Sequence, residues 1–284
     1  DPVDLSKVDR LRLRLERKGP HPVRWCMSPL TFTLDQPPRL TDAVPDGVKL
    51  LDELGQSATR QWPGRTKSPE ELTRRLRTQL DQTDDQRWPE GWSKWGGWAE
   101  RQFEATGFFR THHDGQRWWL VDPAGHPFWS AGCDCVRNNI LSAFSGLEKA
   151  LTWLPESDGD YAGLFAQGTK EGERISFNYL GANFIRAFGS AEWEARWAKV
   201  ALAQLRAFGF NTVGNWSDWQ HAAAAGFPYV RPLPVSFPKT KRVFRDLPDV
   251  FDPAFEQDAA DYAEALRETR DDPAMIGYFL MNEP

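Results

Sequence analysis

The stretch Met275-Ile276-Gly277-Tyr278-Phe279-Leu280-Met281-Asn282-Glu283-Pro284 decides the fold class. An apolar and aromatic run of this length predicts a strand buried on both faces, as in parallel sheets covered by helices. Glu283 would then lie at the carboxyl end of the strand, where a (β/α) barrel collects its catalytic side chains. Glu283 is therefore a candidate acid. The structural alternative is an apolar strand that Pro284 ends, because proline cannot continue the ladder.

The residues before this stretch alternate between expected strands and helices. We expect strands at 128–133, 210–216 and 229–235, and helices at 190–208, 221–225 and 252–270. This order predicts a parallel sheet with crossover helices. A complete eight-unit barrel needs about 250 residues. The sequence from 108 to 284 therefore predicts an α/β fold, namely the first half only of a (β/α)8 TIM barrel that would form the catalytic domain.

Two further regions precede the expected barrel. Residues 1–40 alternate as strands do, with Leu11, Leu13 and Leu15 on one face, and predict the end of a β domain. Residues 41–107 predict a linker with one helix that starts at Ser68-Pro69, followed by a Trp- and Gly-rich loop at 87–98. The Asp114-Gly115 pair predicts a hairpin. Residues 139–181 predict a long insertion with a helix near 145–154.

The composition limits the possible partners. The net charge is −5 with interspersed signs, which gives no electrostatic reason to expect a nucleic-acid or anionic-membrane partner. No apolar run approaches the ~20 residues of a membrane helix, and the first residues lack the pattern of a signal peptide. The three cysteines predict small buried thiols, and neither a metal nor a cofactor is expected. The 14 tryptophans stand out, since Trp can stack on a sugar ring or fill a core.

Polar residues follow the first two strands of the expected barrel. Candidate binding residues are Asp134, Arg137 and Asn138 after the first strand, and Asn215, Trp216 and Asp218 after the second. Each group has a structural alternative. Asp134 and Arg137 can pair with each other, Asp218 can cap the short helix that follows it, and Trp216 can be a core residue.

Three stretches resemble a known family. They are Leu51-Asp52-Glu53-Leu54-Gly55-Gln56 with Trp62-Pro63-Gly64, then Ala105 to Arg110 with Trp118 to His126, and finally Gly209-Phe210-Asn211-Thr212-Val213-Gly214-Asn215-Trp216-Ser217-Asp218. Together they resemble the β-agarases of glycoside hydrolase family fifty, a member of clan A. The resemblance implies that residues 1–40 end a jelly-roll, carbohydrate-binding-like β-sandwich. It also implies that residues 108–284 belong to a barrel with Asn-Glu after its fourth strand.

The resemblance implies a retaining hydrolase of β-linked galactose, with agarose as its polysaccharide or oligosaccharide substrate. Glu283 matches the acid/base, and Asn282 matches the neighbour that contacts the sugar 2-hydroxyl. The nucleophile, a second carboxylate about 5–5.5 Å from the acid, would follow Pro284. Two alternatives stay open: a clan A hydrolase that acts on another β-glycan or β-galactoside, and a non-catalytic carbohydrate-binding fragment. The resemblance also implies a secreted or periplasmic protein of unknown oligomeric state.

Overall fold

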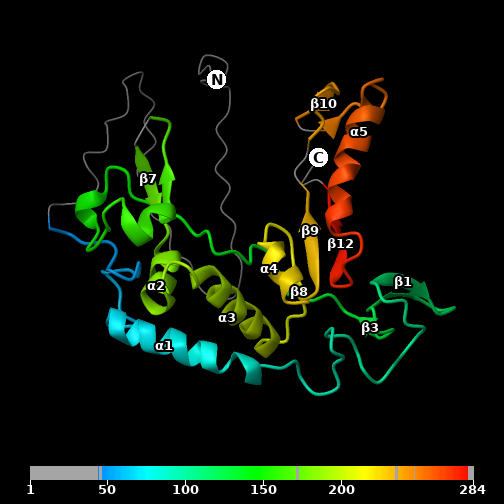
Figure 1. Cartoon of the computed structure of the whole chain (residues 1–284), viewed down its shortest axis with the longest axis horizontal. Helices are drawn as coiled ribbons and strands as arrows, with labels where there is room; N and C mark the ends of the chain where they lie inside the picture. Colours follow the sequence, from blue (N-terminus) through cyan, green and yellow to red (C-terminus); the bar gives the residue numbers. More distant parts are fainter. Residues whose placement is uncertain (1–43, 45–46, 171–172, 234–235, 246, 281–284) are drawn as a thin grey trace, which may run out of the picture. The chain divides into compact units, whose positions relative to one another are not determined.

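The computed structural model describes residues 44, 47–170, 173–233, 236–245 and 247–280, which lie in the larger of two compact units, 44–284 (Figure 1). Residues 1–43 form the other unit and are not described, so the expected jelly-roll strands at 1–40 stay a prediction. The α-helices are α1 (Pro69–Asp81), α2 (Tyr179–Phe188), α3 (Trp193–Ala207), α4 (Trp219–Ala224) and α5 (Phe255–Glu264). The 3-10 helices are η2 (Thr83–Asp85), η3 (Glu148–Ala150), η4 (Gly159–Leu164) and η5 (Ala265–Glu268).

The strands form four small sheets. Their bounds are β1 (Arg110–His113), β2 (Trp118–Val121), β3 (Pro127–Phe128), β4 (Gly132–Cys133), β5 (Ser142–Ala143), β6 (Phe165–Gln167), β7 (Arg174–Phe177), β8 (Thr212–Val213), β9 (Tyr229–Pro232), β10 (Arg242–Phe244), β11 (Leu247–Pro248) and β12 (Met275–Phe279). The sheets are β1-β2-β3, β5-β7-β6, β10-β11 and β12-β9-β8-β4.

The sheet β12-β9-β8-β4 is parallel throughout, and its strands are neighbours in the order in which the chain makes them. Figure 1 shows β9 and β12 side by side. The expected strand–helix alternation is thus confirmed for these strands. The helices α3, α4 and α5 occur in the crossover connections that join these parallel strands.

The strand β12 is less buried than its sequence predicted. Each of its residues is only half-buried, so the expectation of burial on both faces is wrong for this strand. The reason is its position, because in the described part of the chain β12 lies at the edge of the sheet and pairs only with β9.

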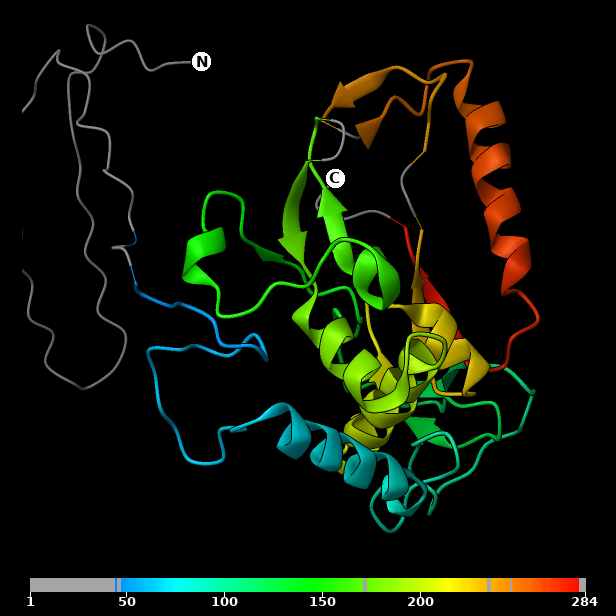
Figure 2. The same cartoon turned by 60° about the vertical axis from the view of Figure 1, so that its left-hand side comes forward.

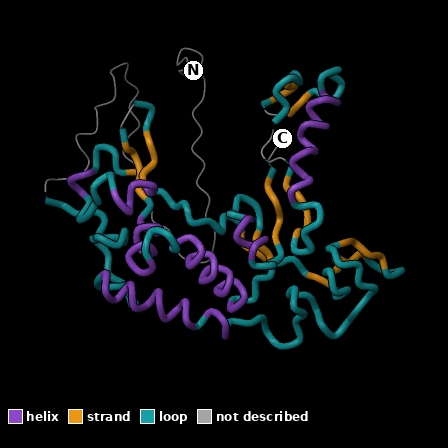
Figure 3. Tube along the Cα trace, in the orientation of Figure 1, coloured by secondary structure: helices purple, strands orange, loops and turns teal. Residues whose placement is uncertain are grey.

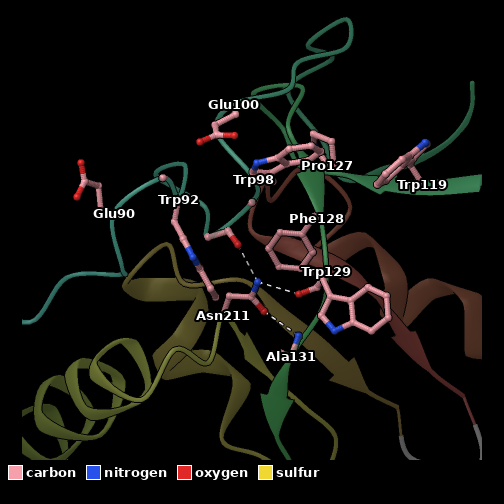
Figure 4. A pocket seen from close by; sticks show the side chains of 13 residues that line it. Glu90, Trp92, Trp98, Glu100, Trp119, Pro127, Phe128, Trp129, Ala131 and Asn211 are labelled. Carbon is pink, nitrogen blue, oxygen red and sulfur yellow. Dashed lines mark hydrogen bonds between the residues drawn. The ribbon is translucent and has the colours of Figure 1, made fainter.

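The stretch 128–133 is divided between two sheets, which corrects the expectation of one barrel strand. Phe128 ends β3, which pairs antiparallel with β2, whereas Gly132 begins β4, which pairs parallel with β8. The side chain of Asn211 forms hydrogen bonds with the backbone between the two strands (Figure 4). Its Nδ2 donates to the carbonyl of Trp129 (3.0 Å), and its Oδ1 accepts from the backbone N–H of Ala131 (2.9 Å).

Two hydrophobic clusters support these elements. The first packs α1, α2 and the start of α3 against the β5-β7-β6 sheet around Phe177, which is fully buried. The second joins the end of α3, through Leu202 and Leu205, to Val213 of β8 and Tyr229 of β9. Figure 3 shows α1, α2 and α3 close together, in agreement with the contacts among them. The helix α3 therefore takes part in both clusters.

The N-terminus of α1 follows its sequence signal. The Ser68 hydroxyl accepts from the N–H of Glu71 (3.2 Å), and Pro69 occupies the first helical position. The carboxylate of Glu71 turns back to the N–H of Lys67 (2.9 Å), one residue before the cap. The predicted start of this helix at Ser68-Pro69 is thus confirmed.

Residues 139–181 contain more structure than expected. The segment forms the antiparallel β5-β7-β6 sheet and the turns η3 and η4, and only η3 falls in the helix expected near 145–154 (Figure 2). The chain then enters α2, which the sequence interpretation missed. Gly181, the last residue of the expected insertion, lies within α2, and a Cβ there would lie 2.7 Å from Leu164 Cδ2. Close packing therefore explains this glycine.

The remaining differences are local. Glu192 occupies the N-cap position of α3 without a side-chain capping bond, whereas the hydroxyl of Ser190, where the helix was expected to begin, donates to Asp160 Oδ1 (2.8 Å). Phe208, the last residue of the expected helix, follows α3 as its C-cap and is 69% exposed. Cys133 is half-buried and Cys135 is exposed, so the expectation of buried thiols is wrong for both. None of the helices within the described ranges is long and apolar enough to cross a membrane.

Candidate functional site

The candidate site lies where β4 and β8 end. These strands are parallel neighbours, with Gly132 opposite Thr212 and Cys133 opposite Val213. The residues that follow each strand therefore emerge at the same edge of the sheet. The expected binding residues Asp134, Arg137 and Asn138 follow β4, and Asn215, Trp216 and Asp218 follow β8.

Asp134 connects the two loops. Its Oδ1 accepts from the backbone N–H of Asn215 (2.8 Å), and the N–H of Cys135 donates to the carbonyl of Asn215 (2.9 Å). A Cβ on Gly214 would collide with the same carboxylate oxygen of Asp134, so this contact requires glycine. Asp134 is bonded to the loop after β8 and makes no ion pair with Arg137 among the described residues. The proposed Asp134–Arg137 pair is wrong.

Asp218 and Asn138 extend the connection. Asp218 occupies the N-cap position of α4, but its side chain caps none of the helix N–H groups. Its Oδ2 accepts from the N–H of Asn138 (2.9 Å) instead, while the carbonyl of Asn138 accepts from Asn178 Nδ2 (2.8 Å). The alternative that Asp218 caps α4 is thus correct for its position, but its side chain does not make the expected bond to a helix N–H group. Asn178 itself caps α2, so the two loops are also fixed to that helix.

Asn215 has a polar side chain without a protein partner. It is only 5% exposed, and neither Oδ1 nor Nδ2 has a hydrogen-bond partner in the part of the chain that the structure describes. A buried amide in this state loses free energy of hydration without compensation, which is uncommon in native proteins. It offers one donor group and one acceptor that a hydroxyl-rich ligand can satisfy.

Trp216 brings the loop after β8 to the end of β12. Its ring centroid lies 6.0 Å from that of Phe279, the last residue of β12, at an interplanar angle of 56°. Trp216 is 48% exposed, so the core alternative is wrong for it. Its φ of 55° is in the left-handed region, which costs a non-glycine residue of order 1 kcal/mol. The strained backbone presents an aromatic face to solvent beside β12.

The remaining expected residues are separate from this network or outside the described ranges. Arg137 is exposed, on the same loop as Asn138. Asn282 and Glu283 lie outside the described residues, so their positions stay a prediction. The described chain ends at Leu280, directly after β12. Through its contact with Phe279, Trp216 is the candidate residue that comes nearest along the chain to Asn282 and Glu283.

The sequence interpretation missed Ser217. Its hydroxyl accepts from the N–H of Val136 (2.9 Å), and it is buried between the two loops. Its place between the candidates Trp216 and Asp218 was the available signal. Within the described ranges, no group of three or more His, Cys, Asp or Glu side chains could hold a metal ion. The site therefore offers amides, hydroxyls, carboxylates and an aromatic face, which are the groups that bind sugar hydroxyls and ring faces.

Comparison with known proteins gives sequence relatives of a single kind. No family model matches the chain. Beta-agarase B of Vibrio sp. (strain JT0107) is 31% identical over 271 residues, which cover 82% of this chain and 28% of that protein. Beta-agarase A of the same strain is 28% identical over 194 residues, which cover 58% of this chain and 18% of that protein. The chain thus spans less than a third of the length of either relative.

Solved structures agree with these relatives. The agarase AgWH50C superposes with a TM-score of 0.72 and 26% identity, over 83% of this chain and 38% of its own. PfGH50B superposes with a TM-score of 0.71 and 28% identity over the same shares of the two chains. An exo-beta-agarase gives a TM-score of 0.67 at 25% identity. In sequence and in fold, most of this chain is similar to part of these β-agarases.

Proposed function

We propose that the protein is a glycoside hydrolase that cleaves β-linked galactose units of agarose with retention of configuration. The observation that carries this proposal is the match to Beta-agarase B, at 31% identity over 271 residues. The parallel sheet supports it, because β12 precedes Asn282-Glu283 as a barrel strand precedes its catalytic residues. On this proposal the four parallel strands are the first half of a (β/α)8 barrel.

Glu283 would act as the acid/base. In a retaining mechanism its protonated carboxyl donates a proton to the glycosidic oxygen while a second carboxylate attacks the anomeric carbon from about 5–5.5 Å. The nearby negative charge and the loss of hydration would raise the pKa of Glu283, so that it keeps its proton at neutral pH. Asn282 would donate to the sugar 2-hydroxyl. The second carboxylate would come from the part of the barrel beyond the fourth strand.

The loops after β4 and β8 would form the neighbouring subsites. Trp216 would stack on the apolar face of a sugar ring, because its half-exposed ring lies beside Phe279 at the end of β12. Asn215 would accept from and donate to sugar hydroxyls with its unpartnered amide. Asp134, Asn138 and Asp218 would position these two residues through the bonds between the loops, and Arg137 would bind at the exposed rim. Agarose is an extracellular polymer, so we place the protein outside the cytoplasm.

A product assay tests the substrate and the stereochemistry together. The full-length protein is incubated with agarose, with an agarose-free β-galactan and with cellulose, and the first product released is followed by proton NMR. We expect turnover of agarose alone, with the β-anomer appearing first. Initial release of the α-anomer would contradict the retaining mechanism, and turnover of cellulose in preference to agarose would contradict the substrate. Tight binding of agarose oligosaccharides without turnover would identify a binding protein instead.

A further inference from the structure

One face of α5 joins the helix to the carboxyl ends of two parallel strands. Phe255, Asp258 and Tyr262 follow one another at intervals of three and four residues, so they share this face. The helix lies between β9 and β12 in the chain, and these strands are parallel neighbours whose carboxyl ends meet at the same edge of the sheet. Figure 1 shows β10, in the loop after β9, beside the start of α5.

Asp258 fixes the loop after β9 to this helix. It is fully buried, and its Oδ2 accepts from the N–H of Lys239 (2.9 Å) and from both the N–H (2.8 Å) and the hydroxyl (2.7 Å) of Thr240. Hydrogen bonds to a carboxylate are stronger than those between neutral groups. The start of the hairpin β10-β11 is therefore held against α5.

Ring packing orients Tyr262 on the same face. The ring of Phe237 stacks on that of Phe255, with centroids 5.6 Å apart and an interplanar angle of 7°. Its centroid also lies 5.3 Å from that of Tyr262. Aromatic pairs at these separations contribute stability beyond the burial of their area. The ring of Tyr262 is thus fixed by the loop after β9, and replacement by phenylalanine keeps this packing.

The hydroxyl of Tyr262 reaches the segment that follows β12. It donates to the carbonyl of Leu280 (2.9 Å) and lies 3.5 Å from the carbonyl of Leu233, the residue after β9. The ladder between the two strands closes one residue earlier, where the N–H of Leu233 donates to the carbonyl of Phe279 (3.0 Å). Burial raises the pKa of Tyr262, so its hydroxyl keeps the proton that it donates. Within the described ranges, the bond to Leu280 is the last along the main chain before Glu283.

A fixed Leu280 limits where Glu283 can lie. Glu283 follows Leu280 by three residues, a stretch that extended chain spans in about 10 Å. A general acid must come within about 2.6–3.2 Å of the atom that it protonates. A misplacement of about 1 Å that originates away from the reacting atoms can lower a rate about a hundredfold. A hydrogen bond this near the proposed acid can therefore affect proton transfer without any contact with the substrate.

We propose that Tyr262 is a positioning residue for the proposed acid: its hydroxyl fixes the backbone at Leu280 and thereby holds the Glu283 carboxyl within reach of the glycosidic oxygen. This role rests on the proposed function, since it takes Glu283 as the proton donor. Tyr262 acts through the main chain. Because its ring also packs on Phe237, the position of the loop after β9 and that of the acid are set by the same helix.

The test compares two leaving groups in the full-length protein. An agarose hexasaccharide releases a sugar oxygen that must be protonated as its bond to the anomeric carbon breaks. A dinitrophenyl β-glycoside of an agarose oligosaccharide releases a phenolate, which takes the electron pair of the bond and needs no proton. The kcat/KM value follows the step in which the leaving group departs. We expect Tyr262→Phe to lower kcat/KM about tenfold for the hexasaccharide, a part of the about 10²–10⁴-fold that general acid catalysis contributes, and less than about twofold for the aryl glycoside.

Two variants serve as controls. Tyr278→Phe removes a hydroxyl that bonds to the carbonyl of Leu266 (3.1 Å) and to the hydroxyl of Thr269 (3.2 Å), not to the segment after β12. It should leave both kcat/KM values unchanged. Glu283→Gln should show the same dependence on the leaving group as Tyr262→Phe, with a larger loss on the hexasaccharide.

The outcomes separate the positioning role from the proposed function. An equal loss on both substrates in Tyr262→Phe is what a general structural effect gives, and it would overturn the positioning role, as would unchanged activity on the hexasaccharide. If Glu283→Gln shows the selective loss and Tyr262→Phe does not, the positioning role alone fails. If Glu283→Gln is fully active on the hexasaccharide, the proposed function fails, and the positioning role fails with it.

Discussion

Asn211 joins three segments that are distant in the sequence, and its replacement tests how the start of the sheet is held. Its buried side chain binds the carbonyl of Gly96 in the Trp- and Gly-rich loop, and both sides of the break between β3 and β4, at Trp129 and Ala131. The substitution Asn211→Ala removes these bonds together and leaves the three backbone groups without a partner. We expect it to be strongly destabilising.

The size of the effect follows from the burial of each group. The bond to Gly96 is buried, so its loss costs about 1–3 kcal/mol, whereas the bonds to Trp129 and Ala131 are partly buried and cost about 0.5–1.5 kcal/mol each. The expected loss is therefore about 2–6 kcal/mol. Asn211→Asp should cost at least as much at neutral pH. It keeps the acceptor for Ala131 but turns a carboxylate oxygen toward two carbonyl oxygens.

The assay is urea unfolding followed by tryptophan fluorescence. Asn139→Ala is the control, because Asn139 is an exposed asparagine at the surface and its loss should change stability by less than about 0.5 kcal/mol. If Asn211→Ala stays within about 1 kcal/mol of the parent protein, the hydrogen bonds of Asn211 are not what holds the three segments together. A markedly more stable Asn211→Asp variant would contradict the assigned orientation of the amide.

Three further predictions concern the loops, the sheet and the hairpin. Asn215→Ala should change the free energy of unfolding by less than about 1 kcal/mol, because the amide has no partner among the described residues. The same substitution should weaken the binding of agarose oligosaccharides. A large loss of stability with intact binding would instead show that Asn215 is purely structural. Gly132→Ala should destabilise the protein by about 1–3 kcal/mol in the same urea assay, because the new methyl group would collide with the Thr212 carbonyl, and an unchanged midpoint would contradict this packing. The backbone N–H of Arg117 and the indole N–H of Trp119 hold the pKa of Asp114 well below its ordinary value. The stabilisation that the ionised Asp114 carboxylate gives the fold is therefore complete above about pH 4 and is lost as the pH falls through the lowered pKa. Asp114→Asn should flatten the acid side of the stability profile, and an unaltered profile would refute this role.

The order of the parallel strands was predictable from the sequence because each strand has a local signal. Apolar runs at 210–216, 229–235 and 275–280 are separated by helices with recognisable stops, such as Gly209 with its φ of 77°. The hairpin at Asp114-Gly115 and the start of α1 at Ser68 follow the same logic, since turn and cap chemistry involves neighbouring residues.

The differences have long-range causes. The break between β3 and β4 depends on Asn211, which is about 80 residues away from Trp129 and Ala131 in the chain. The helix α2 was missed because Gly181 is explained by its packing against Leu164 and not by a turn. A local sequence pattern around residues 129–131 does not include Asn211, and one around Gly181 does not include Leu164.

The candidate site was predictable in location and not in its bonds. Placing polar residues at the carboxyl ends of neighbouring strands correctly brought Asp134 and Asn215 together. The pairing of Asp134 with the backbone of Asn215, and of Asp218 with Asn138, depends on the register of β4 against β8, which the sequence alone does not give. For the same reason Ser217 was missed.

The most direct test of the central claim is the turnover of agarose by the full-length protein with Glu283→Gln, compared with Asp271→Asn, which removes an exposed carboxylate near the start of the same strand. We predict that Glu283→Gln lowers kcat by a factor of about 10²–10⁴ while oligosaccharide binding is retained, and that Asp271→Asn is as active as the parent protein. Unchanged turnover by Glu283→Gln would show that this carboxyl is not the proton donor.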